Sequence, residues 1–127
     1  MGKVDFANTL YDTAMSMSRA AFAGRHYAVA YHALAAALHA AFDLGDDSRL
    51  AEVGQLAGEQ DAQLARRDPA HELSAPSAAA RGARSLWATL AEDAQRRRGI
   101  LGQQRRLMQT SGRGEGASGG EPTPRGA

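Results

Sequence analysis

Residues 21–46 of the chain read AFAGRHYAVAYHALAAALHAAFDLGD, and this stretch decides the fold. Its large apolar residues recur at a spacing of three or four, which places them on one face of a helix. They are Tyr27, Tyr31, Leu34, Leu38, Ala41 and Phe42. Alanines beside this stripe allow neighbouring helices to approach on both flanks. Gly24 and Gly45 bound the segment, because glycine readily adopts the left-handed conformation that ends a helix. The spacing therefore predicts a close-packed helix from about residue 26 to residue 44.

The same spacing predicts three further helices, over about residues 4–23, 48–67 and 76–98. The stripe expected in the core from helix 4–23 comprises Phe6, Leu10, Ala14, Met17 and Ala21. The stripe expected from helix 48–67 comprises Leu50, Val53, Ala57 and Leu64, with Leu56 beside it. The stripe expected from helix 76–98 comprises Ala83, Leu86, Leu90 and Ala94, with Trp87 beside it.

Short links between these segments determine how the helices pack. The link LGDDS at residues 44–48 requires its two flanking helices to be near-antiparallel neighbours, and it offers Asp46, Asp47 and Ser48 as N-caps. We therefore predict an all-α fold, a small antiparallel bundle of three to four helices over residues 1–98. Gly99 and Gly102 bracket a predicted break. Residues 99–127 should form a basic, Gly/Pro-rich flexible tail that is disordered after about residue 111.

The composition excludes several classes of protein. The 127 residues include no cysteine, which excludes disulfides, thiolate zinc sites and cysteine nucleophiles. This fits the reducing cytoplasm, where we expect the protein to act. The longest apolar stretch, residues 27–42, is too short and too polar to span a membrane. Aromatic residues make up only 6% of the chain, so we expect a thin core that depends on helix propensity and close packing.

The polar residues of the central helix gather on one side. At about 100° per residue, four of them lie nearly opposite Leu34. They are Arg25, His32, His39 and Asp43. A stripe that mixes arginine with aspartate is typical of a solvent-facing surface, and we regard it as a candidate partner-binding site.

The histidines in this stripe also raise the question of a metal or catalytic site. His32 and His39 lie two turns apart, about 10 Å along the axis, which is too far for both to bind one ion. His39 and Asp43 are four residues apart and could bind the same metal ion, with a further ligand such as His71, Glu52 or Glu59. No serine-based or paired-carboxylate arrangement accompanies them. The sequence therefore predicts no enzyme, no cofactor and no resident metal.

Charge is distributed unevenly along the chain. Residues 1–80 carry 6 basic and 10 acidic side chains and residues 81–127 carry 9 and 4, so their net charges are −4 and +5. The basic excess gathers in five arginines: Arg96, Arg97, Arg98, Arg105 and Arg106. Arginine clusters bind phosphates without sequence preference. Weak binding of nucleic acid or another acidic surface through this basic arm is therefore the alternative function.

Residues 10–60 resemble one tetratricopeptide-type helical hairpin with its link to the next helix. In such hairpins a small residue and a glycine end the first helix, an aromatic residue follows, and alanines occupy close helix contacts. The matching residues are Gly24, Tyr27, Ala30, Ala37 and Leu38, and the DLGD sequence resembles the turn. The resemblance implies protein–protein binding. We therefore expect a small adaptor or scaffold that binds another protein or associates with itself.

Overall fold

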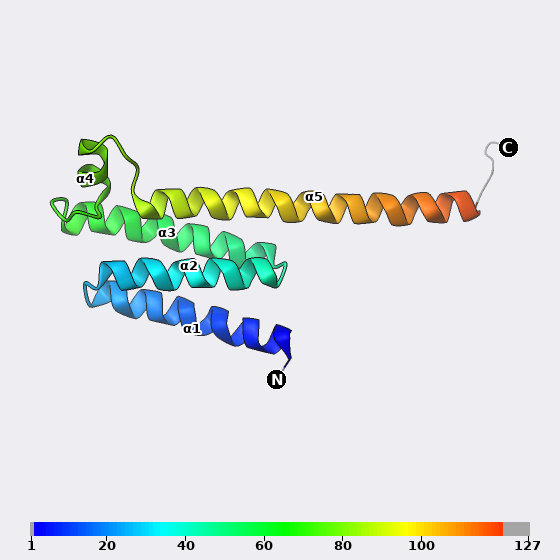
Figure 1. The fold of residues 1–127 in the computed structure, drawn as a ribbon, viewed down its shortest axis with the longest axis horizontal. Coiled ribbons are helices and arrows are strands. Elements are labelled where there is room, and N and C mark those ends of the chain that lie inside the picture. Colours follow the sequence, from blue (N-terminus) through cyan, green and yellow to red (C-terminus); the bar gives the residue numbers. More distant parts are fainter. Residues whose placement is uncertain (1, 121–127) are drawn as a thin grey trace.

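The computed structural model describes the backbone of residues 2–120 and the side chains of residues 2–111. Five helices follow one another: α1 (Lys3–Ala23), α2 (Tyr27–Asp43), α3 (Asp47–Arg67), α4 (Ala75–Ala80) and α5 (Leu86–Gly120). α1, α2, α3 and the first half of α5 lie together as a four-helix bundle (Figure 1). The described residues contain no strand, so the predicted all-α bundle is confirmed. No helix in this part of the chain is long and apolar enough to cross a membrane.

α2 is the central helix of the bundle and packs against α1, α3 and α5. Ala30, Ala37 and Ala41 are completely buried, as their proposed role in close helix contacts requires. The larger residues of the predicted stripe also lie in the core or pack against it: Tyr27, Tyr31, Leu34, Leu38 and Phe42. The predicted stripe of α3 is confirmed as well, because all of its residues are buried: Leu50, Val53, Leu56, Ala57 and Leu64.

The turns at the two ends of α2 determine how the neighbouring helices enter and leave it. Asp46 caps α3 by accepting a hydrogen bond from the Arg49 backbone N–H at 3.1 Å. Gly45 has a φ of 64°, the left-handed conformation that reverses the chain between α2 and α3. Before α2, the left-handed residue is Arg25, with a φ of 67°, whereas Gly24 has a φ of −85°. The conformation predicted for Gly24 therefore falls on Arg25, a residue for which it costs free energy.

The single helix predicted over residues 76–98 is wrong, because the chain turns within it. α4 ends at Ala80, and Gly82 adopts a left-handed φ of 74°. α5 then starts after Ser85, whose hydroxyl accepts a hydrogen bond from the Ala88 backbone N–H at 3.0 Å. The same hydroxyl donates to the Asp61 carboxylate of α3 at 2.7 Å, so the start of α5 is fixed to α3.

This break changes which side chains of the predicted stripe are buried. Ala83 lies in the turn and is exposed, and Leu86 is 41% exposed. Leu90 and Ala94 are buried as predicted, but Trp87 is completely buried and is the largest side chain in the core. The face of α5 that meets the bundle is therefore centred on Trp87.

α5 also continues beyond its predicted end. The helix passes Gly99 and Gly102 without a break and runs to Gly120, so the predicted helix end at residue 98 is wrong. Each glycine costs about 1 kcal/mol of helix propensity relative to alanine. Leu101 lies between them and is only 8% exposed, so its packing on the bundle offsets that cost. The flexible tail predicted for residues 99–127 is therefore replaced by helix up to Gly120. Residues 121–127 lie outside the described residues, and the disorder predicted for them stays a prediction.

A buried chain of polar groups crosses the bundle. The Trp87 indole N–H donates to the Gln60 side-chain carbonyl at 2.8 Å, and the Gln60 amide donates to the Ser18 hydroxyl at 3.1 Å. Ser18 in turn donates to the backbone carbonyl of Ala30 at 2.7 Å. These residues belong to α5, α3, α1 and α2. Because an unpaired buried polar group is costly, this chain favours one register of the four helices.

Candidate protein-binding surface

α1 carries apolar side chains on two faces, and only one of these faces lies in the core. The inner face consists of buried residues: Tyr11, Ala14, Met15, Ser18 and Phe22. The other face, which we call the outer face, consists of Phe6, Leu10 and Met17. Their side chains are 60%, 37% and 51% exposed, respectively. At about 100° per residue, the three lie within about 40° of one another around the helix axis, so they form one stripe.

The predicted core stripe of α1 is therefore largely wrong. Of its five residues only Ala14 is buried, and Ala21 is half-buried. Residues of the inner face make specific contacts with the other helices. Phe22 packs edge-on against Tyr27 of α2, with ring centroids 5.1 Å apart. Ser18 belongs to the buried polar chain. These contacts place the inner face in the core, and the outer face then points away from it.

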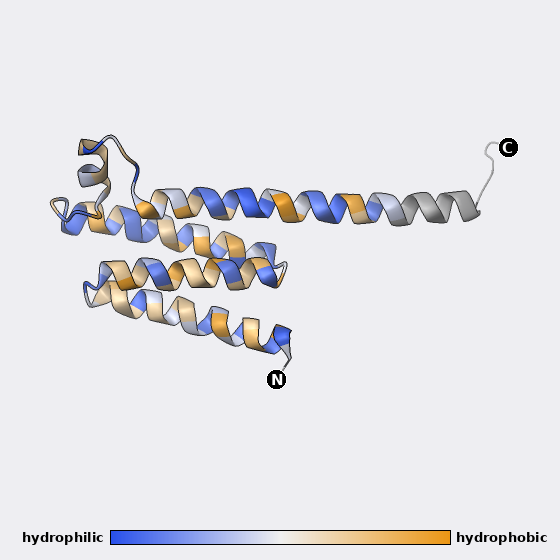
Figure 2. Cartoon of the chain, viewed as in Figure 1, coloured by the Kyte–Doolittle hydropathy of each residue, from blue (hydrophilic) through white to orange (hydrophobic). Residues whose placement is uncertain are grey.

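The outer face continues into a groove at one end of the bundle, between the start of α1 and the end of α2. The groove has a volume of about 760 Å³. Its lining residues are Gly2, Lys3, Val4, Phe6, Ala7, Leu10, Ala40, Asp43 and Leu44. Lys3 and Asp43 are the only charged residues among them, so the groove is largely apolar. Figure 2 shows hydrophobic residues along α1 and α2, whereas the coloured part of α5 is mostly hydrophilic. We call this groove the end groove. The end groove and the outer face together form what we call the α1 surface.

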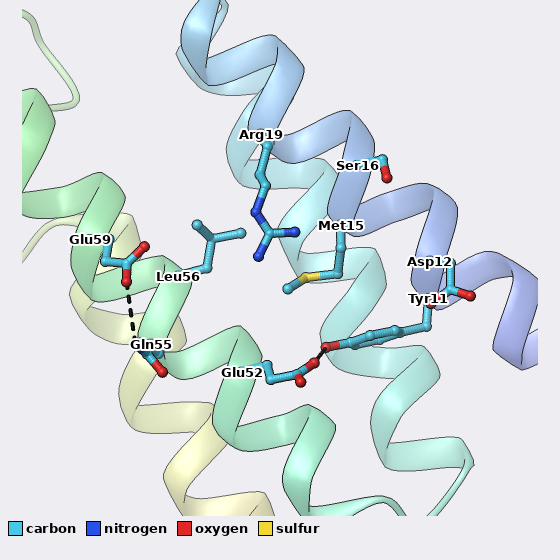
Figure 3. Close-up of a pocket in the computed structure, with 9 residues that line it drawn as sticks. All are labelled: Tyr11, Asp12, Met15, Ser16, Arg19, Glu52, Gln55, Leu56 and Glu59. Atoms are coloured by element: carbon cyan, nitrogen blue, oxygen red, sulfur yellow. Dashed lines mark hydrogen bonds between the residues drawn. The ribbon is translucent and has the colours of Figure 1, made fainter.

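A second groove, of about 540 Å³, lies between α1 and α3 and has a polar character (Figure 3). Tyr11 points across it and donates a hydrogen bond from its hydroxyl to Glu52 at 2.6 Å. Burial raises the pKa of the Tyr11 phenol, and the bond to the Glu52 carboxylate raises it further. Tyr11 therefore stays protonated near neutral pH. It acts as a hydrogen-bond donor that joins α1 to α3, and Arg49 lies over its ring at 4.9 Å.

The histidine stripe of α2 faces outward, as the sequence predicts. Arg25, His32, His39 and Asp43 are all exposed. His71 does not join them: its ring stands edge-on to Tyr27, with the centroids 5.0 Å apart, and its Nδ1 accepts a hydrogen bond from a backbone N–H. Within residues 2–111, no three His, Asp or Glu side chains come together in a way that could hold a metal ion.

The predicted basic arm divides into two parts. Arg96 and Arg97 pair with Asp93 on the same helix, and the Arg97 guanidinium also lies 4.8 Å from the centre of the Phe42 ring. Arg98 binds both carboxylate oxygens of Asp47, at 2.9 and 3.1 Å, which fastens α5 to the start of α3. Arg97 and Arg98 therefore contact other helices of the bundle, whereas Arg96 pairs only within α5 and its side chain is 68% exposed. The other two, Arg105 and Arg106, follow Leu101 and are exposed.

Apolar spacing alone places Phe6, Leu10 and Met17 in the core and gives no indication of the buried polar chain. A signal for the polar chain was present, because Ser18 and Gln60 occupy positions of helical spacing within otherwise apolar stripes of α1 and α3. A polar residue at such a position needs a buried partner. The side chain of the only tryptophan could supply one, since an indole N–H seeks an acceptor when it is buried.

Comparison with known proteins leaves the fold without an assigned family. The tetratricopeptide-type resemblance of residues 10–60 accordingly stays a prediction. No protein family model, no curated protein and no solved structure gives a significant match to this chain.

Proposed function

We propose that this chain is a non-catalytic protein-binding module, an adaptor or scaffold, that binds through the α1 surface. The observation that carries the proposal is the exposure of Phe6, Leu10 and Met17 beside a largely apolar groove. Contiguous exposed apolar residues of this kind mark interaction sites on protein surfaces. The resemblance of residues 10–60 to a tetratricopeptide-type hairpin implies the same function.

The α1 surface offers binding free energy at a small entropic cost. Fully burying a Phe, Leu or Met side chain contributes about 1.5–3 kcal/mol, and roughly half of that is available from a side chain that is half exposed. The packed inner face already orders the backbone of α1, so a partner does not have to order it. Met17 adds adaptability, because its flexible thioether chain fits partner surfaces of different shape.

The exposed stripe of Arg25, His32, His39 and Asp43 meets the α1 surface at Asp43, which also lines the end groove. A polar rim around an apolar centre is the usual arrangement of a protein–protein interface. We therefore keep these four residues in the proposed binding region, with the apolar residues of α1 as its centre.

The alternative proposal, nucleic-acid binding through the basic arm, has a narrower basis. Arg96, Arg97 and Arg98 are paired with carboxylates of the bundle. The exposed arginines, Arg96, Arg105 and Arg106, then offer about three phosphate contacts, for which the logarithm of affinity falls with log salt with a slope of about 2.1–2.7. A titration of DNA at two salt concentrations tests this value. A much steeper slope would favour nucleic acid over protein as the partner.

Photocrosslinking from inside the α1 surface tests the main proposal. A photoreactive amino acid replaces Phe6 or Met17 in the full chain, produced in its host cells. The matched control places it at Asp12, an exposed position of the same helix that lies outside the stripe. We expect protein adducts from positions 6 and 17 and few from position 12, with mass spectrometry identifying the partner. Equal yields at all three positions would contradict the proposal.

A further inference from the structure

α5 extends well beyond the bundle. Leu101 is the last buried residue among the described side chains of α5, and we call the part of the helix that follows it, residues 102–120, the α5 extension. At 1.5 Å per residue this extension is about 28 Å long. Figure 1 shows that it projects from the end of the bundle where α1 begins and α2 ends. The end groove lies at that same end.

The α5 extension has the character of a helix that needs a partner. Leu107 and Met108 are 64% and 76% exposed, and no described side chain after Leu101 is buried. A solvated helix of this length is only marginally stable in water, and Gly102 weakens it further. Contact with an apolar surface would stabilise the helical form. The extension cannot reach the end groove of its own chain, because α5 runs straight and lies on the opposite side of the bundle from α1 (Figure 1).

We propose that the α5 extension of one chain docks on the α1 surface of a second copy, and that the second copy returns the same contact. This inference rests on the proposed function of the α1 surface, and it names the partner. In each contact Leu107 and Met108 cover the apolar residues of the end groove. The outer face spans about 16 Å from Phe6 to Met17, so the α5 extension is long enough to cover it.

Charge complementarity supports this partner. Arg105 and Arg106 give the described part of the α5 extension two positive charges and no negative one. On the groove side, α2 ends with Asp43 and has no basic residue in its last turn. On the α2 side of the groove, the Asp43 carboxylate and the negative C-terminal end of the helix dipole favour a cation from outside. Lys3 and the positive N-terminal end of α1 lie on the other side of the groove, so the arginines of the extension suit its α2 side.

Reciprocity enlarges the contact. A stable specific interface buries about 1,200–2,000 Å² in total. A twofold axis repeats the contact and doubles the buried area, because each chain supplies one extension and one groove. The two contacts then form and separate together.

The mass of the full chain in solution, by sedimentation equilibrium, tests the proposal. We expect a concentration-dependent dimer of the 13.4 kDa chain. Phe6→Glu places a charge in the groove and Leu107→Glu places one on the extension, so each should weaken association by about tenfold or more. The matched control is Gln109→Glu, which makes the same change of charge about 160° around the helix from Leu107. It should leave the dimer intact, and circular dichroism should show unchanged helix content in all three variants.

Mixing the two weak variants tests the extension-in-groove arrangement itself. In the mixed dimer one contact is free of both charges, because the Phe6→Glu chain supplies its extension and the Leu107→Glu chain its groove, whereas the other contact carries both charges. A contact that one charge has already broken loses nothing further from a second. We therefore expect the mixture to associate more tightly than either variant alone. If it does not, the copies pair in another way and the inference is wrong. A wild-type chain that stays monomeric also overturns it, whereas crosslinks from position 6 to a different protein would leave the proposed function standing.

Discussion

The burial of the two faces of α1 is the opposite of what their polarity predicts. The inner face buries the hydroxyls of Tyr11 and Ser18, whereas the outer face leaves Phe6 and Met17 in solvent. Hydropathy alone would reverse this arrangement. What decides it is the partner of each group: Tyr11 finds Glu52 on α3, and Ser18 joins the buried polar chain. A helix with two apolar faces is therefore oriented by its hydrogen bonds as well as by its hydrophobicity.

Each face of α1 contains one phenylalanine, so the two faces can be compared with the same substitution. Phe22 is 4% exposed and packs against Tyr27, so Phe22→Ala should lower the free energy of unfolding by about 3–5 kcal/mol. Phe6→Ala should change it by less than about 0.5 kcal/mol, because Phe6 is largely exposed. Denaturant unfolding of dilute protein, followed by circular dichroism, measures both.

Protein concentration sharpens this test. If the outer face is an interface, the effect of Phe6→Ala on stability should grow as the protein is concentrated, because association stabilises the folded chain by mass action. The effect of Phe22→Ala on each chain's own fold should persist at every concentration. Equal losses from the two variants in dilute solution would refute the assignment of inner and outer faces.

Methionine offers a second matched pair, with smaller effects. Met15 is 5% exposed and Met17 is 51% exposed. Met15→Ala should destabilise the fold by about 2–5 kcal/mol, since it leaves a cavity at the inner face. Met17→Ala should fall within about 0.5 kcal/mol of the wild type. Thermal melting followed by circular dichroism can rank the two variants, and a reversed order would contradict the burial of Met15.

The buried polar chain should contribute less than the large apolar residues but remain measurable. Gln60→Leu removes the acceptor of the Trp87 indole N–H and the donor to Ser18. Leaving these buried groups unpaired should cost about 1–3 kcal/mol. Gln55→Leu on the same helix is the control, because Gln55 is exposed. Amide hydrogen exchange should show faster opening of α1 and α3 in Gln60→Leu alone; unchanged protection would mean that the polar chain does not orient α1.

The ion pair between Asp47 and Arg98 should have the smallest effect. The hydrogen bonds from Arg98 lower the pKa of Asp47 below its ordinary value of 3.8. Because the folded-state pKa is the lower one, the contribution to stability is complete above about pH 5 and is lost as the pH falls through the folded-state pKa. Asp47→Asn should remove this part of the acid sensitivity, as unfolding midpoints at several pH values would show. An unchanged pH profile would show that the pair adds nothing to the attachment of α5.

Three of the helices could be predicted from sequence because their boundaries have local causes. Gly45 and Asp46 form the turn between α2 and α3, and both residue types favour that role. The break at Gly82 is not predicted by the sequence because apolar spacing continues across it, from Ala79 to Leu90. The passage of α5 through Gly99 and Gly102 was missed for the opposite reason. Local propensity predicts a stop there, and the packing of Leu101 overrides it.

The α1 surface was harder to predict, because periodicity defines a face without saying what covers it. The spacing of Phe6, Leu10 and Met17 is correct for a buried stripe. Their exposure follows from contacts made by the other face with α2 and α3, which are distant in sequence. The exposure of Arg25, His32, His39 and Asp43 was predictable, since charges of both signs on one stripe are seldom buried.

The burial of Trp87 gives the bundle a built-in optical reporter. It is the only tryptophan of the chain, and its fluorescence can therefore be excited without a label and assigned to one site. The ring centroids of Tyr31 and Phe22 lie 5.8 and 6.5 Å from that of Trp87. The Trp87 indole N–H donates to Gln60, which donates in turn to Ser18 of α1. Indole emission shifts to longer wavelength when water reaches the ring. Separation of any of the four helices should therefore shift the Trp87 emission. A partner that covers the outer face of α1 should leave the emission wavelength unchanged. One fluorescence spectrum therefore distinguishes binding from unfolding.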